Sequence, residues 1–354
     1  MLEGEELNIL HVVPGLDNPF NGIVVAAKLI AGEQTAEIVD AREFGKIKDL
    51  TKYEEVWVHS CWLPMMLKAC WRVVKAKRPL VRMTHANLDP VRLRYHGWKK
   101  WLVGPIERYF LRRCEKIVAT CEAEKAWIEA YLGNRCPEIV VEDVKRFFNF
   151  SRKERKGRVE ERENSVSRVE RVDRVEGERF EARVSGSTSA RYKSNSQLIT
   201  HNSQLNLLYL GRRHPLKGVE YLETAVRQLQ NSTRSARSTR LKIELKIVSN
   251  AFGEELEKIW DWCDVLVLPT LSENFGLVVA EALERGKRVI TTDGAPAWGD
   301  DLNRVERVDR VEGELGIGFN GRLLYLKGYR DGTNEKRVEL LCKGISLVVS
   351  DEPF

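Results

Sequence analysis

Strand and helix signals alternate along this chain of 354 residues, in two separate stretches. Short runs rich in Val, Ile and Leu are each followed by a segment whose apolar residues recur three and four positions apart. The expected strands are 8–13, 55–59, 80–83 and 116–119 in the first stretch, and 207–210, 245–248, 265–268 and 288–291 in the second. The expected helices are 23–31, 65–75, 219–229 and 253–262. This alternation favours two α/β domains, each built on a doubly wound parallel sheet.

The composition changes between the two stretches. Large apolar residues nearly vanish over 151–203, where Arg, Lys, Glu, Ser and Val dominate. Such a segment cannot bury enough apolar surface to order its backbone. We therefore expect an N-terminal domain at 1–150, a charged low-complexity insertion or flexible linker at 151–203, and a C-terminal domain at 204–354.

One string, RVERVDRVEGE, occurs twice, at 168–178 and at 304–314. Valine stands at every third position of this string, which matches neither the period of a helix nor that of a strand. An identical string in two unrelated places favours a duplicated insertion over a charged interaction module. We expect both copies to be irregular and the second to interrupt the C-terminal domain near 301–315.

Composition and charge argue against several classes of protein. The formal net charge of +6 and the pI near 8.8 fall short of a dedicated nucleic-acid binder. No apolar run is long enough to span a membrane, and the acidic N-terminus does not resemble a secretory signal. The seven cysteines form no C-x-x-C pair and no zinc-ligand spacing with histidine. We expect a cytoplasmic protein with reduced cysteines, no nucleic-acid partner and no metal site.

The most informative local pattern lies in 271–300, LSENFGLVVAEALERGKRVITTDGAPAWGD. It joins two expected strands through a turn and a helix. Glu273 lies in the turn and Glu281 in the helix, so a rise of ~1.5 Å per residue separates the two carboxylates by roughly 10 Å. A similar distance separates the hexose from the ribose of a nucleotide sugar. The backbone amides around Gly276 and Leu277, where the helix begins, suit a diphosphate.

This block resembles the acidic signature of family 4 glycosyltransferases of the GT-B fold, in which seven residues separate two glutamates. The first glutamate opens the string ENFG and the second opens EAL, and the loop 293–296 matches a small-residue turn of that family. The resemblance implies two Rossmann-like domains that face a cleft, with the low-complexity insertion between them. It also implies that Glu273 contacts the transferred hexose and that Glu281 binds the ribose. The other donor-binding residues implied in this block are Asn274, Phe275, Gly276 and Leu277.

Basic residues and glycines elsewhere resemble the phosphate-binding positions of that family. Arg212 follows an expected strand in a Gly-Arg pair, and Lys217 follows shortly after in a Lys-Gly pair. The resemblance places both on the donor phosphates, where they neutralise the departing nucleoside diphosphate. In the loop 14–22, Gly22 and secondly Gly15 resemble a glycine that lets the backbone approach the phosphates, where a side chain would clash.

Two histidines end strands of the first domain. His85 lies in THANLDP, which resembles a family segment whose histidine faces the transferred sugar. Ala86 and Asn87 replace the glycine and methionine of that segment, so the sequence departs from the family pattern there and the resemblance does not fix the local backbone geometry. His59, in HSCW, resembles a His-Gly-x-Trp motif and is the weaker candidate. The expected catalytic residues are His85, Glu273, Arg212 and Lys217.

The function implied by the resemblance is a retaining transfer of a sugar from a nucleotide-sugar donor to a glycan or glycolipid acceptor. No divalent metal and no cofactor are expected, and cell-envelope polysaccharide or lipopolysaccharide synthesis is the implied setting. Two alternatives stay open: a nucleotide-sugar epimerase of the same fold, and a catalytically inactive protein that binds a nucleotide sugar or other partners. The second repeat, close to the presumed site, and little sign of a terminal helix returning to the first domain motivate the inactive alternative.

One further stretch bears on the partners. Aromatic and basic residues interleave over 92–116, which suits an anionic membrane surface. An ordinary helix with its basic face in water is the other interpretation. If the acceptor is lipid-linked, we expect docking through this stretch and a peripheral location on the cytoplasmic face of the membrane.

Overall fold

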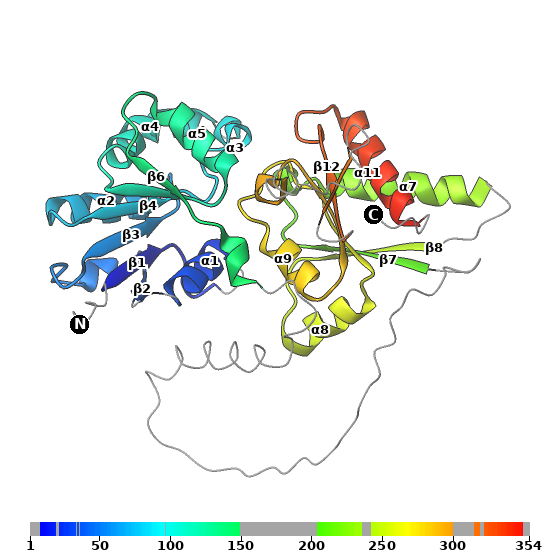
Figure 1. The fold of residues 1–354 in the computed structure, drawn as a ribbon, viewed down its shortest axis with the longest axis horizontal. Helices are drawn as coiled ribbons and strands as arrows, with labels where there is room; N and C mark the ends of the chain where they lie inside the picture. The colour runs from blue at the N-terminus through cyan, green and yellow to red at the C-terminus, as the bar shows by residue number, and fades with distance from the viewer. Residues whose placement is uncertain are drawn as a thin grey trace, which may run out of the picture.

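Two six-stranded sheets form two α/β domains that lie side by side (Figure 1). The structure, a computed structural model, describes residues 8–18, 21–32, 34, 36–95, 97–148, 204–235, 242–299, 315–318 and 322–349. The expected linker and both copies of RVERVDRVEGE lie outside these residues. The predicted pair of doubly wound α/β domains is confirmed.

The first sheet is parallel throughout, with the strand order β2-β1-β3-β4-β5-β6. Its strands are β1 (Ile9–Val13), β2 (Ala36–Asp40), β3 (Glu55–His59), β4 (Leu80–Met83), β5 (Lys116–Ala119) and β6 (Glu138–Val141). Its helices are α1 (Gly22–Ala31), α2 (Pro64–Lys75), α3 (Pro90–Arg94), α4 (Gly97–Leu111) and α5 (Glu122–Leu132), with short 3-10 helices η1 (Phe44–Lys46) and η2 (Val144–Phe147). The central strands are buried on both faces, which explains why β1 and β4 are apolar apart from His11 and Arg82.

The second sheet has the order β11-β12-β10-β9-β7-β8 and is parallel except for the β11–β12 pair. Its strands are β7 (Gln204–Leu210), β8 (Lys242–Val248), β9 (Val265–Leu268), β10 (Arg288–Thr292), β11 (Leu315–Gly318) and β12 (Leu323–Leu326). Its helices are η3 (Pro215–Lys217), α7 (Val219–Ser235), α8 (Gly253–Trp262), α9 (Leu277–Glu284) and α11 (Asn334–Val349). Figure 1 shows α7 and α11 on one side of this sheet and α8 and α9 on the other.

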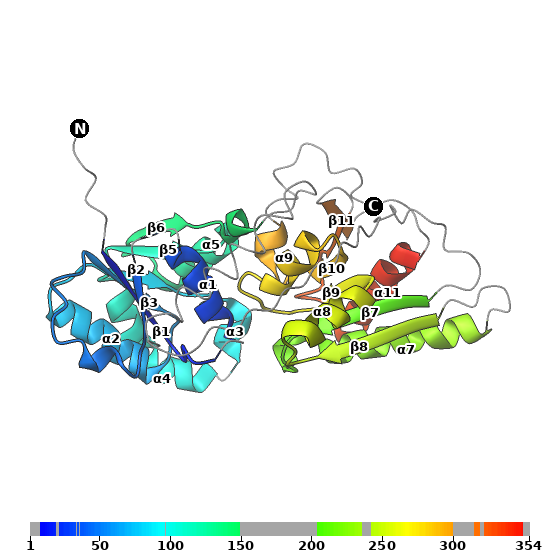
Figure 2. The same ribbon diagram turned by 90° about the horizontal axis from the view of Figure 1, so that it is seen from below.

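The two domains contact each other, and the chain crosses from the first to the second at η2. Val144 and Phe148, at η2, pack in the hydrophobic core of the second domain, so the chain reaches that domain just before residue 149. Helix α11 packs against α7 within the second domain. In both views, α1 and α3 of the first domain lie on the side that faces α9 of the second (Figures 1 and 2). Loops that follow strands of both sheets meet at this interface, the usual ligand position in such folds.

Candidate active site

A buried ion pair between Lys217 and Glu273 lies on the second-domain side of the interface. Lys217 ends η3, after β7, and Glu273 lies in the loop between β9 and α9. Nζ of Lys217 donates to Oε2 of Glu273, and the two side chains are only 15% and 18% exposed. Burial acts to raise the pKa of Glu273, but the charges of Lys217 and Arg92 outweigh it and hold this pKa below its usual value. Glu273 is therefore an ionised carboxylate in a contact that is largely shielded from water.

Two glycines let the loops around this pair approach each other closely. Gly218 has φ +62°, and a Cβ there would lie 2.1 Å from the carbonyl oxygen of Pro269. A Cβ on Gly294 would lie 2.1 Å from the carbonyl oxygen of Thr270. The carbonyl of Gly294 in turn accepts the backbone N–H of Glu273 at 2.7 Å. A side chain at either position would clash with the facing backbone, which explains the glycine of the Lys-Gly pair and the glycine of the small-residue loop.

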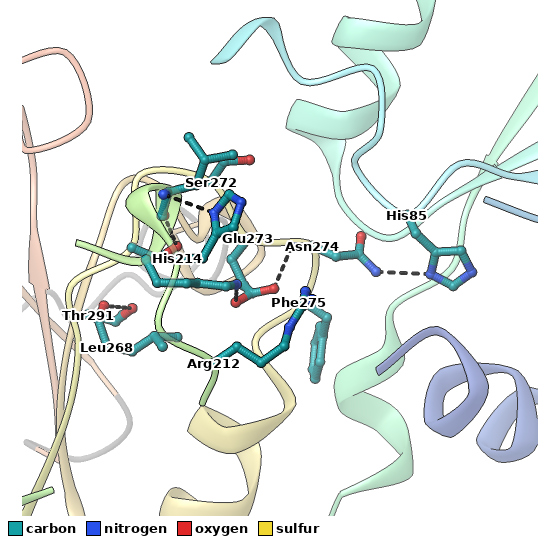
Figure 3. Close-up of polar contacts among 12 residues, drawn as sticks. His85, Arg212, His214, Leu268, Ser272, Glu273, Asn274, Phe275 and Thr291 are labelled. Carbon is teal, nitrogen blue, oxygen red and sulfur yellow. Dashed lines mark hydrogen bonds and ion pairs between the residues drawn. The ribbon is translucent and has the colours of Figure 1, made fainter. Parts of the chain in front are cut away.

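Arg212 lies at the end of β7 with an exposed side chain. Its carbonyl accepts the hydroxyl of Tyr209 at 2.8 Å, which fixes the turn that follows the strand. Two residues later, the ring of His214 lies 5.1 Å from the ring of Tyr95, across the domain interface. Arg212 and His214 are both drawn near Glu273 in Figure 3. An exposed guanidinium at this strand end is accessible to a phosphate.

His85 follows β4 in a backbone held in the left-handed region. The φ angles of His85 and Ala86 are +52° and +54°, a conformation that costs energy for residues with a Cβ. The buried carboxylate of Glu124 accepts the N–H of Ala86 and the hydroxyl of Thr84, at 2.6 Å for the latter. It also accepts the N–H and the hydroxyl of Thr120, at 2.8 and 2.7 Å. Glu124 thus ties two strand ends together, and Ala86 adopts the conformation expected of the glycine that it replaces.

The two domains meet directly at His85 (Figure 3). Nδ1 of His85 lies 3.1 Å from the side-chain nitrogen of Asn274, the residue after Glu273. The side-chain oxygen of Asn274 contacts the hydroxyl of Thr120 at 3.0 Å. Burial, with a further contribution from the charge of Arg92, lowers the pKa of His85 to about 3, so the ring is neutral at pH 7. The structure therefore brings His85 and the glutamate loop together, as the sequence analysis requires.

A second set of polar contacts closes the interface beside His85. The hydroxyl of Ser272 donates to Asp89, and Nε of Arg92 donates to the same hydroxyl oxygen at 2.9 Å. Asp89 is also paired with Arg330 of the second domain. These contacts were not predicted from the sequence, in which Arg92 was interpreted only as part of a basic surface. The Asp-Pro step at Asp89, a helix-start signal in the loop that follows β4, was the available clue.

Helices α1 and α9 begin close to each other on opposite sides of the interface. Gly22 is the first residue of α1, and a Cβ there would lie 3.9 Å from the side chain of Leu277, the first residue of α9. Gly276, with φ +72°, precedes α9, and Gly15, with φ +70°, turns the loop before α1. Helix N-termini attract anions through their free amides and their dipoles. The predicted glycines therefore lie at or just before the starts of two helices, and their role in binding a diphosphate stays a prediction.

The two remaining predicted donor residues differ in their surroundings. Glu281 lies on α9 and is partly buried. Phe275 is only 2% exposed, and its ring lies 6.0 Å from that of Phe148 and 5.2 Å from that of Trp298. Nε1 of Trp298 also donates to the carbonyl of Phe275 at 2.6 Å. The side chain of Phe275 thus belongs to the core, and only its backbone is placed to line a donor site.

Metal ligands and cavities add two observations. Across the ranges that the structure describes, no three His, Cys, Asp or Glu side chains gather as metal ligands. A cavity of ≈ 290 Å³ adjoins the site and is lined by Arg213, His214, Pro215, Val219 and Glu220. A larger cavity of ≈ 620 Å³ lies away from the site, beside α4.

Two family models match this chain, one on each domain. Residues 21–141 match a model described as a glycosyl transferase 4-like domain. Residues 204–303 match a model described as glycosyl transferases group 1, and this match contains the whole block 271–300. Together the two matches cover more than half of the chain. A comparison with curated proteins finds no significant match.

Solved structures of similar fold cover nearly the whole chain. A sucrose-phosphate synthase from Thermosynechococcus elongatus has a TM-score of 0.57 at 10% identity, over 98% of this chain and 90% of its own. An α,α-trehalose 6-phosphate synthase from Burkholderia multivorans has a TM-score of 0.53 at 9% identity, over 98% and 91%. A trehalose-phosphate synthase from Burkholderia xenovorans, in complex with glucose-6-phosphate, has a TM-score of 0.53 at 9% identity, over 99% and 93%. At such low identity, these likenesses establish the fold alone.

Proposed function

We propose that this chain, which belongs to the family 4-like glycosyltransferases of the GT-B fold, moves a sugar from a nucleotide-sugar donor to a glycan or glycolipid acceptor. The observation that carries the proposal is the Lys217–Glu273 pair, which lies next to Asn274 and, across the interface, His85. A cation and a carboxylate at strand ends, beside two helix starts, suit a ligand that has both a diphosphate and a sugar. By family resemblance, we place the reaction in cell-envelope polysaccharide or lipopolysaccharide synthesis.

The proposed roles on the leaving group follow from charge. The bond between the anomeric carbon and the phosphate oxygen breaks, and negative charge develops on the nucleoside diphosphate. Lys217 and Arg212 neutralise that charge, with the backbone amides at the start of α1 and α9. Lys217 must then turn part of its hydrogen bonding from Glu273 to the phosphate.

The proposed roles on the sugars follow from position. Glu273 and His85 hold the hexose between the domains, which requires Asn274 to move away from His85, and Glu281 binds the ribose. The acceptor hydroxyl attacks from the face that the phosphate leaves, and its proton passes to the departing phosphate oxygen. The sugar configuration is then retained, and the positive charge comes from Lys217 and Arg212 without a metal or a cofactor.

Nucleotide sugars are expected to stabilise the purified protein. A panel of UDP-glucose, UDP-galactose, UDP-N-acetylglucosamine, GDP-mannose and ADP-glucose is compared by thermal shift, with the free sugars as blanks. At about 1,000 times its Kd, the true donor adds about 4 kcal/mol to the stability and raises the Tm. Arg212→Met is expected to shrink this shift without changing the Tm of the protein alone, because Arg212 is exposed.

The neighbouring arginine supplies the matched control for the thermal-shift panel. Arg213 is also exposed, but it is paired with Glu223 at 2.6 Å. Arg213→Met should leave the donor shift intact. The proposal is wrong if no nucleotide sugar moves the Tm, or if Arg212→Met and Arg213→Met act alike.

The proposed lipid-linked acceptor is supported by the surface of α4. Large apolar side chains are exposed along this helix, and Trp101 is 79% exposed. The exposed set on α4 is Trp98, Trp101, Leu102, Ile106 and Tyr109, and Trp71 of the neighbouring α2 is 54% exposed. Among the described helices, none is both long and apolar enough to cross a bilayer. A row of exposed aromatic and aliphatic side chains suits the interfacial region of a membrane.

Positive charge adjoins this apolar surface. The cavity of ≈ 620 Å³ beside α4 is lined by four arginines with Pro105 and Tyr109. These arginines are Arg108, Arg112, Arg113 and Arg135. The guanidinium of Arg113 lies 3.7 Å from the centre of the Tyr109 ring, which holds the charge at the edge of the apolar row. Arginines beside an exposed apolar row favour binding to a bilayer that contains anionic lipid over binding to a neutral one.

Vesicle binding tests the membrane contact. The protein is expected to co-sediment with vesicles that contain phosphatidylglycerol and to bind weakly to pure phosphatidylcholine. Trp98→Ser with Trp101→Ser should abolish binding, and Arg112→Gln with Arg113→Gln should remove the preference for anionic lipid. Phe252→Ser, at a 49% exposed aromatic residue on the other domain, is the matched control. Equal binding to both kinds of vesicle, or none to either, would contradict the membrane proposal.

A further inference from the structure

Three histidine rings form a continuous hydrogen-bonded row behind the proposed sugar site. Nε2 of His85 lies 2.9 Å from Nδ1 of His59. Nε2 of His59 lies 2.9 Å from Nδ1 of His11. The row ends at Gln34, whose side-chain oxygen lies 3.2 Å from Nε2 of His11. The histidines come from β1, from β3 and from the turn after β4, so the row crosses the first sheet from strand to strand.

The two amides at the ends of the row set its direction. In the orientation that the Asn274 amide has in the structure, its side-chain nitrogen faces Nδ1 of His85 and donates to it, and the opposite orientation would reverse every tautomer in the row. The proton of His85 must then be on Nε2, which donates to His59. The same reasoning places the protons of His59 and His11 on Nε2, and the last one is donated to the acceptor oxygen of Gln34. Every ring nitrogen in the row therefore has one partner of the right kind.

The row stays neutral because it is buried. His59 and His85 are 0% and 1% exposed, and burial lowers the pKa of His11 to about 4 and that of His59 well below its usual value. Three charged groups act on the row from the elements packed against it. They are Arg92 on His85, Arg82 on His59 and Glu55 on His11. Both arginines oppose a proton on the row, so only Glu55 favours one.

We propose that His59 and His11 are positioning residues, which hold His85 as the Nε2–H tautomer and present its bare Nδ1 to the transferred sugar. This inference rests on the proposed function, because His85 is taken to face the hexose. In the structure, Nδ1 is the nitrogen that meets the second domain, while Nε2 is engaged inside the first. A hydroxyl of the hexose then replaces the amide of Asn274 and donates to Nδ1. The site therefore selects a sugar that carries a hydrogen-bond donor, a hydroxyl, at that position.

Nitrogen-15 spectra of selectively labelled histidine test the tautomers on the protein alone, without any substrate. At pH 7, each of the three rings is expected to show one protonated nitrogen, Nε2, and one bare nitrogen, Nδ1, and to stay neutral at pH 5. A charged ring, or a protonated Nδ1 on His85, would overturn the inference whether or not the protein transfers sugar. Absence of sugar transfer with the predicted spectra would instead overturn the proposed function.

A matched pair of substitutions at His59 tests the positioning role. The amide of asparagine mimics Nδ1, and that of glutamine mimics Nε2. His59→Asn keeps an acceptor for His85, whereas His59→Gln reaches toward His11 and leaves Nε2 of His85 without one. With the best donor of the panel, His59→Gln is expected to lower kcat about 10- to 100-fold and to leave KM nearly unchanged, while His59→Asn retains most of kcat. Equal loss in both variants, or a changed KM alone, would contradict the role.

Acid unfolding gives an independent reading of the neutral row. Because the pKa values of these histidines are lowered on folding, the unfolded chain binds protons between about pH 6.5 and 4 that the folded chain does not. The stability that these neutral histidines contribute is thus fully present above pH 6.5 and is lost as the pH falls through this window. The slope should decrease in His11→Asn, which removes one of the titrating rings. A slope that does not change in this variant would show that His11 is already charged in the folded protein.

Discussion

Replacing Lys217 by methionine is expected to lower kcat by about 10²- to 10³-fold, the usual cost of removing a group that stabilises developing charge. Lys217 is the buried cation of the proposed site, and its ion pair with Glu273 holds it at the strand ends. The variant is also expected to be less stable by about 3–5 kcal/mol, because Glu273 is left as a buried charge without its main partner. Activity is measured as release of nucleoside diphosphate, and stability by denaturant unfolding.

Two further variants separate the loss of activity from the loss of stability. In Lys217→Met/Glu273→Gln, no lone charge is buried, so stability should recover while activity stays low. Lys343→Met removes a lysine that is 50% exposed and paired with Glu339 at 2.7 Å. This control should change stability by about 1 kcal/mol or less and leave activity unchanged. Recovery of activity in the double variant would show that Lys217 has no role on the leaving group.

Replacing Glu124 by alanine is expected to have the second largest effect, although this residue contacts no proposed ligand. Its carboxylate accepts four hydrogen bonds and is 0% exposed. Each buried donor that loses its partner costs about 1–3 kcal/mol, and the hydroxyls of Thr84 and Thr120 can turn to other acceptors. We therefore expect a loss of about 3–5 kcal/mol in denaturant unfolding. The positive φ of His85 loses its support, so kcat should fall with it.

A neighbouring glutamate and a conservative change serve as controls for this effect. Glu122 lies two residues earlier on α5 and is exposed, and Glu122→Ala removes a favourable charge at the helix start, worth about 0.3–1 kcal/mol. Glu124→Gln keeps an acceptor oxygen and should lie between the two alanine variants. If Glu124→Ala is as stable as Glu122→Ala, the left-handed turn at His85 does not depend on this carboxylate.

The sequence predicted most of the strands that are buried on both faces, but not β12 (Leu323–Leu326), and of the edge strands it predicted only part of β8. Val265–Leu268 is a continuous apolar run and Leu80–Met83 is apolar apart from Arg82, and both were predicted with the bounds found in the structure. In contrast, β2 (Ala36–Asp40) and β6 (Glu138–Val141) are edge strands with exposed or half-buried positions and acidic residues. Their pattern lacks the apolar density that marks a central strand, since one side of an edge strand faces water or a loop.

The site was predictable to the extent that it is local in sequence. Lys217 and Glu273 each lie in a short motif, and the structure joins them. Arg92, Asp89 and Thr120 were not assigned to the site, because their contacts with the second domain join residues far apart in the chain. No periodicity or spacing encodes such contacts. The same holds for the histidine row, which depends on how three neighbouring strands are aligned.

Transfer of a labelled sugar is the measurement that tests the central claim most directly. The donor selected by thermal shift, labelled in its sugar, is incubated with the protein and with lipid-linked and free glycan acceptors. We predict release of nucleoside diphosphate in step with the appearance of label in an acceptor product, and loss of both in Lys217→Met. Donor binding with no release against any acceptor would contradict the claim and favour a protein that only binds nucleotide sugars. Conversion of the label into a different sugar that is still attached to the nucleotide would instead identify an epimerase.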